Sequence, residues 1–72
     1  MERFHEILNG HGLQAMNVGI NHIRIFRDGR KIFDYYPLRM KLFDYHNWYQ
    51  LTYPSFGNGD GKWEQELQEI IG

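Results

Sequence analysis

Cysteine is absent from this chain of 72 residues, and its absence excludes several kinds of chemistry at once. Without thiols a protein has no disulfide framework, no thiolate metal site and no cysteine nucleophile. A chain without disulfides fits a reducing compartment, so we expect a cytoplasmic protein.

Long apolar runs are missing as well. No stretch approaches the roughly 20 consecutive apolar residues of a membrane-spanning helix. The first four residues, Met1 to Phe4, also lack the basic-then-apolar order of a secretory signal. We therefore expect no membrane partner.

The usual patterns of a metal or nucleotide site are not present either. The histidines at positions 5, 11, 22 and 46 show no HExxH or comparable ligand spacing. The glycine-rich segment 57–61 lacks the Gly-Lys-Ser/Thr ending of a phosphate-binding loop, and Asp60 and Glu64 would repel a phosphate. We expect no metal and no cofactor.

Aromatic and apolar residues, in contrast, are abundant. The chain is 17% aromatic and 42% hydrophobic, which is too much for a disordered protein. Its length is that of one domain, near the size at which a single core is only marginally stabilising. We predict a single small domain over residues 1–72 that uses large rings to compensate for its size.

Charge is distributed unevenly, although the net charge is only −1. Residues 22–43 contain six Arg or Lys and two Asp, whereas residues 44–72 contain five acids and one Lys. The middle of the chain is therefore basic and its tail acidic.

The segment from His22 to Pro37 predicts a β-hairpin. Asp28-Gly29 supplies the two positive-φ positions of a two-residue type I′ turn, and the flanking segments are rich in β-branched and aromatic residues. Such a turn fixes the register of both strands. The predicted pairs are Arg27–Arg30, Phe26–Lys31, Ile25–Ile32, Arg24–Phe33, Ile23–Asp34 and His22–Tyr35.

This register sorts the hairpin into two faces, because side chains alternate across a strand. The face that we expect in the core carries Ile23, Ile25, Ile32 and Asp34. The opposite face interleaves cations with rings and carries His22, Arg24, Phe26, Lys31, Phe33 and Tyr35. An unpaired buried carboxylate is costly, so we expect Asp34 at the edge of the core, or paired with Arg39 or with backbone amides.

Patterns on either side of the hairpin predict an α+β fold. Residues 2–9 carry helical apolar spacing, residues 13–18 alternate as a first strand, and residues 38–51 suit a further strand and a second hairpin. Residues 62–71 predict an amphipathic helix with Asp60 as its N-cap. We expect a short N-terminal helix, an antiparallel sheet of three to five strands built on the 22–36 hairpin, and a C-terminal helix, with both helices covering the isoleucine face.

The face opposite the isoleucines is the predicted functional surface. Bases stack on rings and cations neutralise phosphates, so its binding residues suit a nucleic acid. The same residues suit a protein partner, since rings and Arg dominate binding hot spots. These binding residues are Arg24, Phe26, Lys31, Phe33 and Tyr35. In a structural alternative the three rings lie beneath residues 38–53 as a second small core, with the two cations at its rim.

A resemblance points to an origin. The turn Asp28-Gly29 and the run Asp34-Tyr35-Tyr36-Pro37, preceded by His22 to Ile25, resemble a hairpin of small uncharacterised proteins encoded by phages and prophages. The resemblance covers about residues 13–37. It implies a phage-type protein in the cytoplasm of the host cell.

A looser resemblance implies an activity. The order of a helix, Gly12-Leu13, Gly19 before His22, the turn Asp28-Gly29-Arg30 and a final helix is similar to that of HicA-type toxins. Those toxins have a double-stranded-RNA-binding-like fold with a catalytic histidine at a strand start. By position, the resemblance implies His22 as the catalytic base or acid of a ribonuclease.

Two functions follow from the sequence. The first is a non-enzymatic binding module that engages a host protein or a nucleic acid through the predicted surface. The second is a HicA-like ribonuclease that uses His22. Binding to phosphates would weaken steeply with salt, whereas an apolar protein contact would not. An unpaired edge strand also allows a homodimer.

Overall fold

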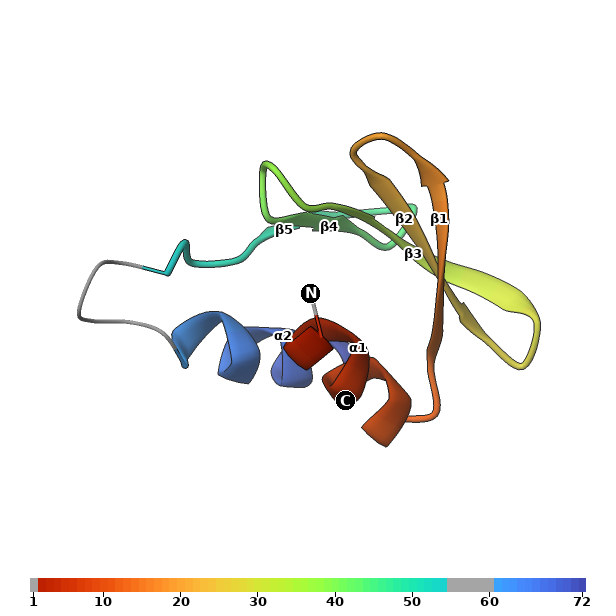
Figure 1. The fold of residues 1–72 in the computed structure, drawn as a ribbon, viewed down its shortest axis with the longest axis horizontal. Coiled ribbons are helices and arrows are strands. Elements are labelled where there is room, and N and C mark those ends of the chain that lie inside the picture. Colours follow the sequence, from red (N-terminus) through yellow and green to blue (C-terminus); the bar gives the residue numbers. More distant parts are fainter. Residues whose placement is uncertain (1, 55–60) are drawn as a thin grey trace.

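The computed structural model describes residues 2–54 and 61–72 of the chain (Figure 1). It confirms the predicted α+β fold: one helix precedes the strands of an antiparallel sheet along the chain, and one helix follows them. In chain order the elements are α1 (Glu2–Gly10), β1 (Gln14–Gly19), β2 (His22–Arg27), β3 (Arg30–Tyr36), β4 (Lys41–Phe43), β5 (Trp48–Gln50) and α2 (Lys62–Ile71).

The molecule has two layers, a sheet and a pair of helices. The five strands are neighbours in the order in which they occur along the chain, from β1 to β5. Figure 1 shows α1 and α2 together on one side of the sheet, and the two helices contact each other. The core between the layers is formed by Phe4, Ile7, Leu8, Leu13, Ile23, Ile25, Phe33, Tyr35, Leu42, Leu51, Leu67 and Ile71.

Helix α1 is short because the chain must return to the sheet. Its apolar residues Phe4, Ile7 and Leu8 are all buried, as their spacing predicts. The Leu13 N–H donates to the Leu8 carbonyl at 2.8 Å, and Gly12 lies at φ 74, a conformation that glycine adopts without strain. These two features end the helix and direct the chain into β1.

Helix α2 covers the sheet beside α1. Its predicted apolar stripe is confirmed: Leu67 and Ile71 are buried, and Trp63 and Ile70 pack against the core. The predicted N-cap, Asp60, lies outside the described residues. Neither this helix nor α1 has the length and apolar character needed to cross a membrane.

The turn of the central hairpin forms as predicted. Asp28 lies at φ 51 and Gly29 at φ 79, the two positive values of a type I′ turn. The first two pairs, Arg27–Arg30 and Phe26–Lys31, are also those that the turn dictates.

Beyond these two pairs the register shifts by one residue. Phe26 pairs with Lys31, but the next residue, Ile25, pairs with Phe33, so Ile32 is an extra residue in β3. This is a β-bulge, and it moves every later side chain of β3 to the other face of the sheet. The pairs after the bulge are Ile25–Phe33, Arg24–Asp34 and Ile23–Tyr35.

The bulge overturns part of the predicted division into faces. Phe33 and Tyr35, predicted on the exposed face, are buried in the core at 8% and 4% exposure. Asp34, predicted beside the isoleucines, lies instead on the face with Arg24. The physical reason is burial: an unbroken register would expose two large rings and place a carboxylate among apolar side chains.

Residues 41–50 extend the sheet and do not cover it. Strand β4 pairs with β3, and β5 pairs with β4 in the predicted second hairpin. The alternative in which residues 38–53 lie over the hairpin as a second small core is therefore wrong. In the described part of the chain, the sheet face turned away from the helices has no layer over it (Figure 1).

The bulged register predicts which ring of the hairpin matters for stability. Phe33→Ala should lower the free energy of unfolding by about 3 to 5 kcal/mol, because the ring is buried in the core. The matched variant Phe26→Ala should cost about 1 kcal/mol, since Phe26 is only half-buried. Urea unfolding followed by circular dichroism measures both. A larger loss for Phe26→Ala would contradict the bulged register.

Candidate functional site

The sheet face turned away from the helices, called here the open face, is the candidate site. Its side chains follow from the strand pairing, because paired residues point to the same side. It combines rings, cations and one carboxylate. Its residues are Gln14, Met16, His22, Arg24, Phe26, Lys31, Asp34, Tyr36, Lys41, Phe43, Trp48 and Gln50.

Asp34 is the buried centre of this face. Its side chain is only 8% exposed. The Arg24 Nε donates to Asp34 Oδ1 at 2.9 Å, and the Tyr45 hydroxyl donates to the same oxygen at 2.7 Å. The His22 Nε2 lies 3.1 Å from Asp34 Oδ2, within ion-pair range, but it is not aligned for a hydrogen bond. The predicted partner Arg39 is therefore replaced by Arg24.

These contacts fix the ionisation of the cluster. Burial acts to raise the pKa of Asp34, but the hydrogen bonds from Arg24 and Tyr45 outweigh burial and hold that pKa below its ordinary value of 3.8. Burial, together with the hydrogen bond to Asp34, raises the pKa of Tyr45 to about 12. The carboxylate is thus charged and the phenol neutral across the physiological range.

A tight turn between β4 and β5 brings Tyr45 to Asp34. The Asp44 carboxylate accepts the N–H groups of His46 and Asn47 at 2.8 and 2.6 Å, and the Tyr49 hydroxyl donates to it at 2.9 Å. Tyr45 lies at φ 74, which is strained for a residue with a side chain. The turn holds that conformation, and Tyr45 reaches Asp34 in it.

Five rings form a continuous row across the open face. The centroids of neighbouring rings in the row lie 4.6 to 5.6 Å apart. His22 stacks on Tyr36 at 4.6 Å, and Phe43 stacks on Trp48 at 4.7 Å. The two pairs are joined by the Tyr36–Trp48 contact at 5.6 Å. Tyr45 meets Phe43 edge-on at 5.3 Å and ends the row, with Lys31 Nζ 5.1 Å above its ring.

The surface forms a hollow beside the contact between Tyr36 and Trp48. Its walls are Tyr36, Arg39, Lys41 and Trp48. The Tyr36 and Trp48 rings are tilted by 41° and are not stacked, so both leave ring surface toward the hollow, and Trp48 is 56% exposed. Among the described residues no acidic side chain lies in ion-pair range of Arg39 or Lys41.

The backbone beside the hollow is held in place by Gln50. Its amide nitrogen donates to the carbonyls of Arg39, Met40 and Leu51 at 3.0, 3.2 and 2.9 Å. Met40 lies at φ 47, in the left-handed region. The turn that carries Arg39 is therefore fixed relative to β5.

The predicted binding residues divide into two groups. Arg24, Phe26 and Lys31 lie on the open face, but the Arg24 guanidinium is already occupied by Asp34. Phe33 and Tyr35 are core residues and do not belong to the surface. His22 lies at the end of the ring row, against Tyr36.

Sequence reasoning missed the four residues of the hollow. Tyr36, Arg39, Lys41 and Trp48 come from β3, the following turn, β4 and β5. The alternation of apolar and basic residues over 38–42 was a signal for a strand with one basic face. It did not show that this face lies beside Trp48.

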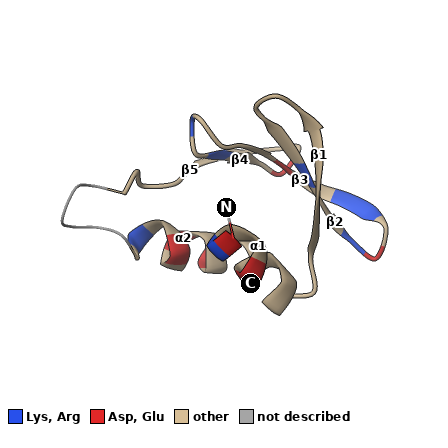
Figure 2. Ribbon diagram, in the orientation of Figure 1, with Lys and Arg blue, Asp and Glu red and all other residues tan. Residues whose placement is uncertain are grey.

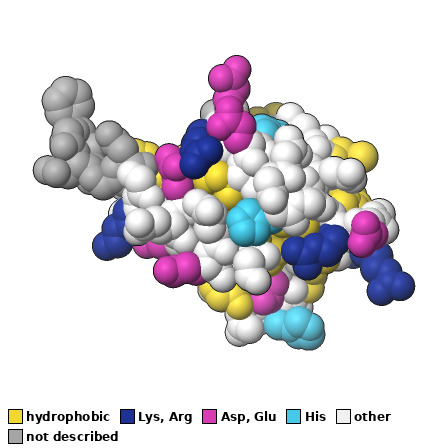
Figure 3. Space-filling model, turned by 90° about the horizontal axis from the view of Figure 1, so that it is seen from below, with side chains coloured by type: hydrophobic (Ala, Val, Ile, Leu, Met, Phe, Trp, Pro, Cys, Tyr) yellow, Lys and Arg dark blue, Asp and Glu magenta, His cyan; other side chains and the backbone are white. Residues whose placement is uncertain are grey.

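Charge is segregated between the two layers (Figure 2). The helices carry five acids and two cations: Glu2, Glu6, Glu64, Glu66 and Glu69 against Arg3 and Lys62. Residues 13–54 carry six cations and three acids: Arg24, Arg27, Arg30, Lys31, Arg39 and Lys41 against Asp28, Asp34 and Asp44. Seen from the helix side, the surface shows acidic, histidine and basic side chains together (Figure 3), so the excess of acids in this layer is one of number and not of a single-sign patch.

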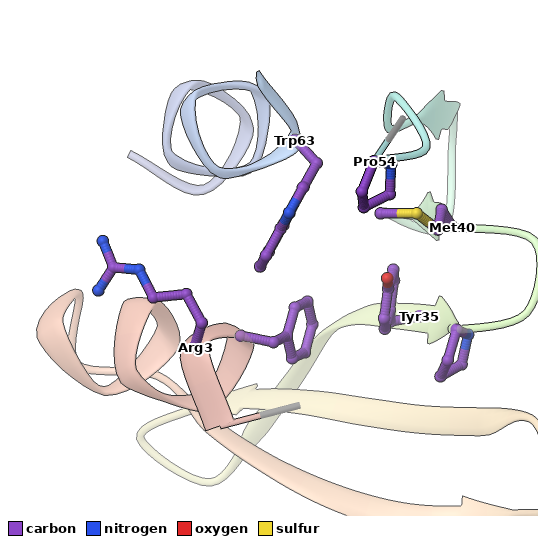
Figure 4. Close-up of a pocket in the computed structure, with 7 residues that line it drawn as sticks. Arg3, Tyr35, Met40, Pro54 and Trp63 are labelled. Atoms are coloured by element: carbon purple, nitrogen blue, oxygen red, sulfur yellow. The ribbon is translucent and has the colours of Figure 1, made fainter. Parts of the chain in front are cut away.

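A second pocket, between the helices and the end of β3, has fewer charged groups that could bind a ligand. It is lined by Arg3, Phe4, Tyr35, Pro37, Met40, Pro54 and Trp63 (Figure 4). Its single charge, Arg3, is paired with Glu64 at 2.8 Å and Glu6 at 3.3 Å. Within residues 2–54 and 61–72, no group of three His, Asp or Glu side chains is placed to hold a metal ion.

Comparisons with known proteins add no assignment. No protein-family model, curated protein or solved structure matches this chain.

The depressed pKa of Asp34 predicts a loss of stability in acid. Its contribution is fully present above the ordinary pKa of 3.8 and is lost as the pH falls through the lower pKa of the folded state. Asp34→Asn should lower the free energy of unfolding by about 2 kcal/mol at neutral pH and flatten its fall below pH 4. Urea unfolding at a series of pH values measures this.

The control is Glu69→Gln, on the exposed surface of α2. This variant should follow the wild-type pH profile. An Asp34→Asn profile as steep as that of the wild type would show that the cluster does not hold Asp34 ionised.

Proposed function

We propose that this protein binds single-stranded nucleic acid on its open face, with one base held in the hollow. The observation that carries the proposal is the hollow itself, where the ring surfaces of Tyr36 and Trp48 meet Arg39 and Lys41, two cations with no acid in ion-pair range among the described residues. Base stacking on rings and phosphate binding by cations are the two components of single-strand recognition.

The geometry favours a single strand over a duplex. Bases inside a duplex cover each other's faces, whereas a base in a single strand is free to stack on a protein ring. In this row, His22–Tyr36 and Phe43–Trp48 are already stacked, so an incoming base finds ring surface mainly at the tilted Tyr36–Trp48 contact. One base in the hollow and neighbouring phosphates on Arg39 and Lys41 fit this arrangement.

The charge distribution supports the same ligand. The layer that carries the open face has an excess of cations, and the helix layer has an excess of acids. A polyanion is attracted to the first and repelled by the second. Lys31, at the far end of the ring row, extends the basic surface beyond the hollow.

The test is binding of a short, labelled single-stranded RNA of mixed sequence, measured by fluorescence anisotropy over a range of salt concentrations. Trp48→Ala should weaken binding about ten-fold, because one base loses its stacking platform. Lys41→Gln should weaken binding and reduce the slope of log affinity against log salt by about one, because one phosphate contact is lost.

Two matched controls keep this test specific. Tyr53→Ala removes a ring that is 55% exposed but does not line the hollow, and Lys62→Gln removes a cation from α2. Both should bind like the wild type. The proposal fails if the wild type does not bind at low salt, or if Tyr53→Ala weakens binding as much as Trp48→Ala.

One contact favours a second candidate function, a ribonuclease that uses His22. The Asp34 carboxylate, 3.1 Å from His22 Nε2, is close enough to accept a hydrogen bond after a small rotation of the ring, and such a bond orients an imidazole for proton transfer, here to or from a ribose hydroxyl. This candidate predicts cleavage of single-stranded RNA that is lost in His22→Ala, while binding to a DNA strand of the same sequence persists. Gel analysis of the RNA measures cleavage, and an inactive wild type would exclude this function.

A further inference from the structure

Strand β1 is an unpaired edge of the sheet. Within residues 2–54 and 61–72 it pairs with β2 on one side and with no strand on the other, and five of its six residues are exposed. Met16 is 56% exposed and Val18 is 40% exposed. A strand in this position presents N–H and C=O groups that are free to pair with another strand.

Nothing in the sequence of β1 opposes such pairing. Residues 12–21 contain no Lys, Arg, Asp, Glu or Pro, although charged residues make up 24% of the chain. Charges and prolines are the usual devices that keep edge strands apart. The single irregularity, a bulge between Asn17 and Gly19, lies at the end of the strand, where the Gly19 N–H meets Asn17 Oδ1 at 3.4 Å.

The other edge of the sheet is different. Strand β5 has three residues, half the length of β1. The side chain of its last residue, Gln50, is engaged with the backbone of the neighbouring turn. Of the two edges, β1 therefore offers the longer and more regular row of free backbone groups.

We infer that β1 pairs antiparallel with β1 of a second copy of this chain, about a two-fold axis at Met16. In that register Met16 faces its own copy and Ala15 faces Asn17, and the regular pairing ends before the bulge at Val18. A neutral strand suits this arrangement, because a charge at the axis would meet a like charge. The inference does not depend on the proposed function.

This pairing joins the two sheets into one continuous sheet. The two-fold axis stands perpendicular to the sheet, so both open faces lie on one side and both helix layers on the other. The exposed apolar side chains of Met16 come together at the centre of the interface.

Cysteine cross-linking tests the register directly, because the chain has no cysteine of its own. In the pairing proposed here, the two copies of residue 16 are cross-strand neighbours with Cβ atoms about 4.5 to 5.5 Å apart, close to disulfide geometry. Met16→Cys should form a disulfide-linked dimer under mild oxidation. Leu38→Cys, at an apolar residue that is 76% exposed on another turn, should stay largely monomeric.

Placing opposite charges at residue 16 gives a second test. Sedimentation measures the molecular mass of the wild type and of the variants. The wild type should rise above its monomer mass of 8.7 kDa as its concentration increases. Met16→Lys and Met16→Glu should each remain monomeric alone and associate when mixed, with circular dichroism confirming that both fold. Leu38→Lys should associate like the wild type.

Three results would overturn the inference. The first is a wild type that stays monomeric up to millimolar concentration. The second is cross-linking of Leu38→Cys as readily as Met16→Cys. The third is a mixture of the Lys and Glu variants that associates no better than either alone.

Discussion

The extra residue in β3 is the constraint on which the rest of this structure depends. With Ile32 left out of the pairing, Phe33 and Tyr35 enter the core and Asp34 leaves it. Side chains on a strand alternate, so one inserted residue changes the environment of every residue after it. The core beneath the sheet and the polar cluster above it are therefore two consequences of the same irregularity.

The cluster around Asp34 links the bulge to the open face. Because the carboxylate points away from the helices, it accepts hydrogen bonds from Arg24 of β2 and from Tyr45 of the β4–β5 turn. His22 lies within ion-pair range of the same carboxylate. These residues come from β2 and from a turn two strands away from it. A carboxylate that is buried, ionised and doubly hydrogen-bonded holds them together more firmly than exposed ion pairs do. The ring row begins and ends on two members of this cluster, His22 and Tyr45.

Much of the fold was predictable from the sequence because its signals are local. The Asp28-Gly29 turn, the apolar spacing of both helices and the alternation of β2 depend on neighbours within a few residues. The bulge has no such local signal, because it results from the competition between burying two rings and burying a carboxylate. The sequence did carry an indirect sign of it, in the predicted placement of Asp34 among isoleucines.

The hollow was not predictable for a related reason. Tyr36 and Trp48 meet across β4, so their contact depends on two strand pairings and on the turn between β3 and β4. That turn contains Met40 in a left-handed conformation that its residue type does not favour, and Gln50 holds it from a distance in sequence. A sequence pattern assigns a residue to one face of its own strand, but it does not assign the register between strands.

The separation of charge between the layers has a consequence for how the molecule meets a partner. A sheet layer with an excess of cations above a helix layer with an excess of acids gives the protein a dipole moment directed from the helices to the sheet, despite a net charge of only −1. In the field of a polyanion such a molecule turns its sheet forward while it is still a Debye length away, about 8 Å at physiological salt. If the proposed nucleic-acid binding holds, the acidic helices repel the polyanion and so disfavour its approach from their side.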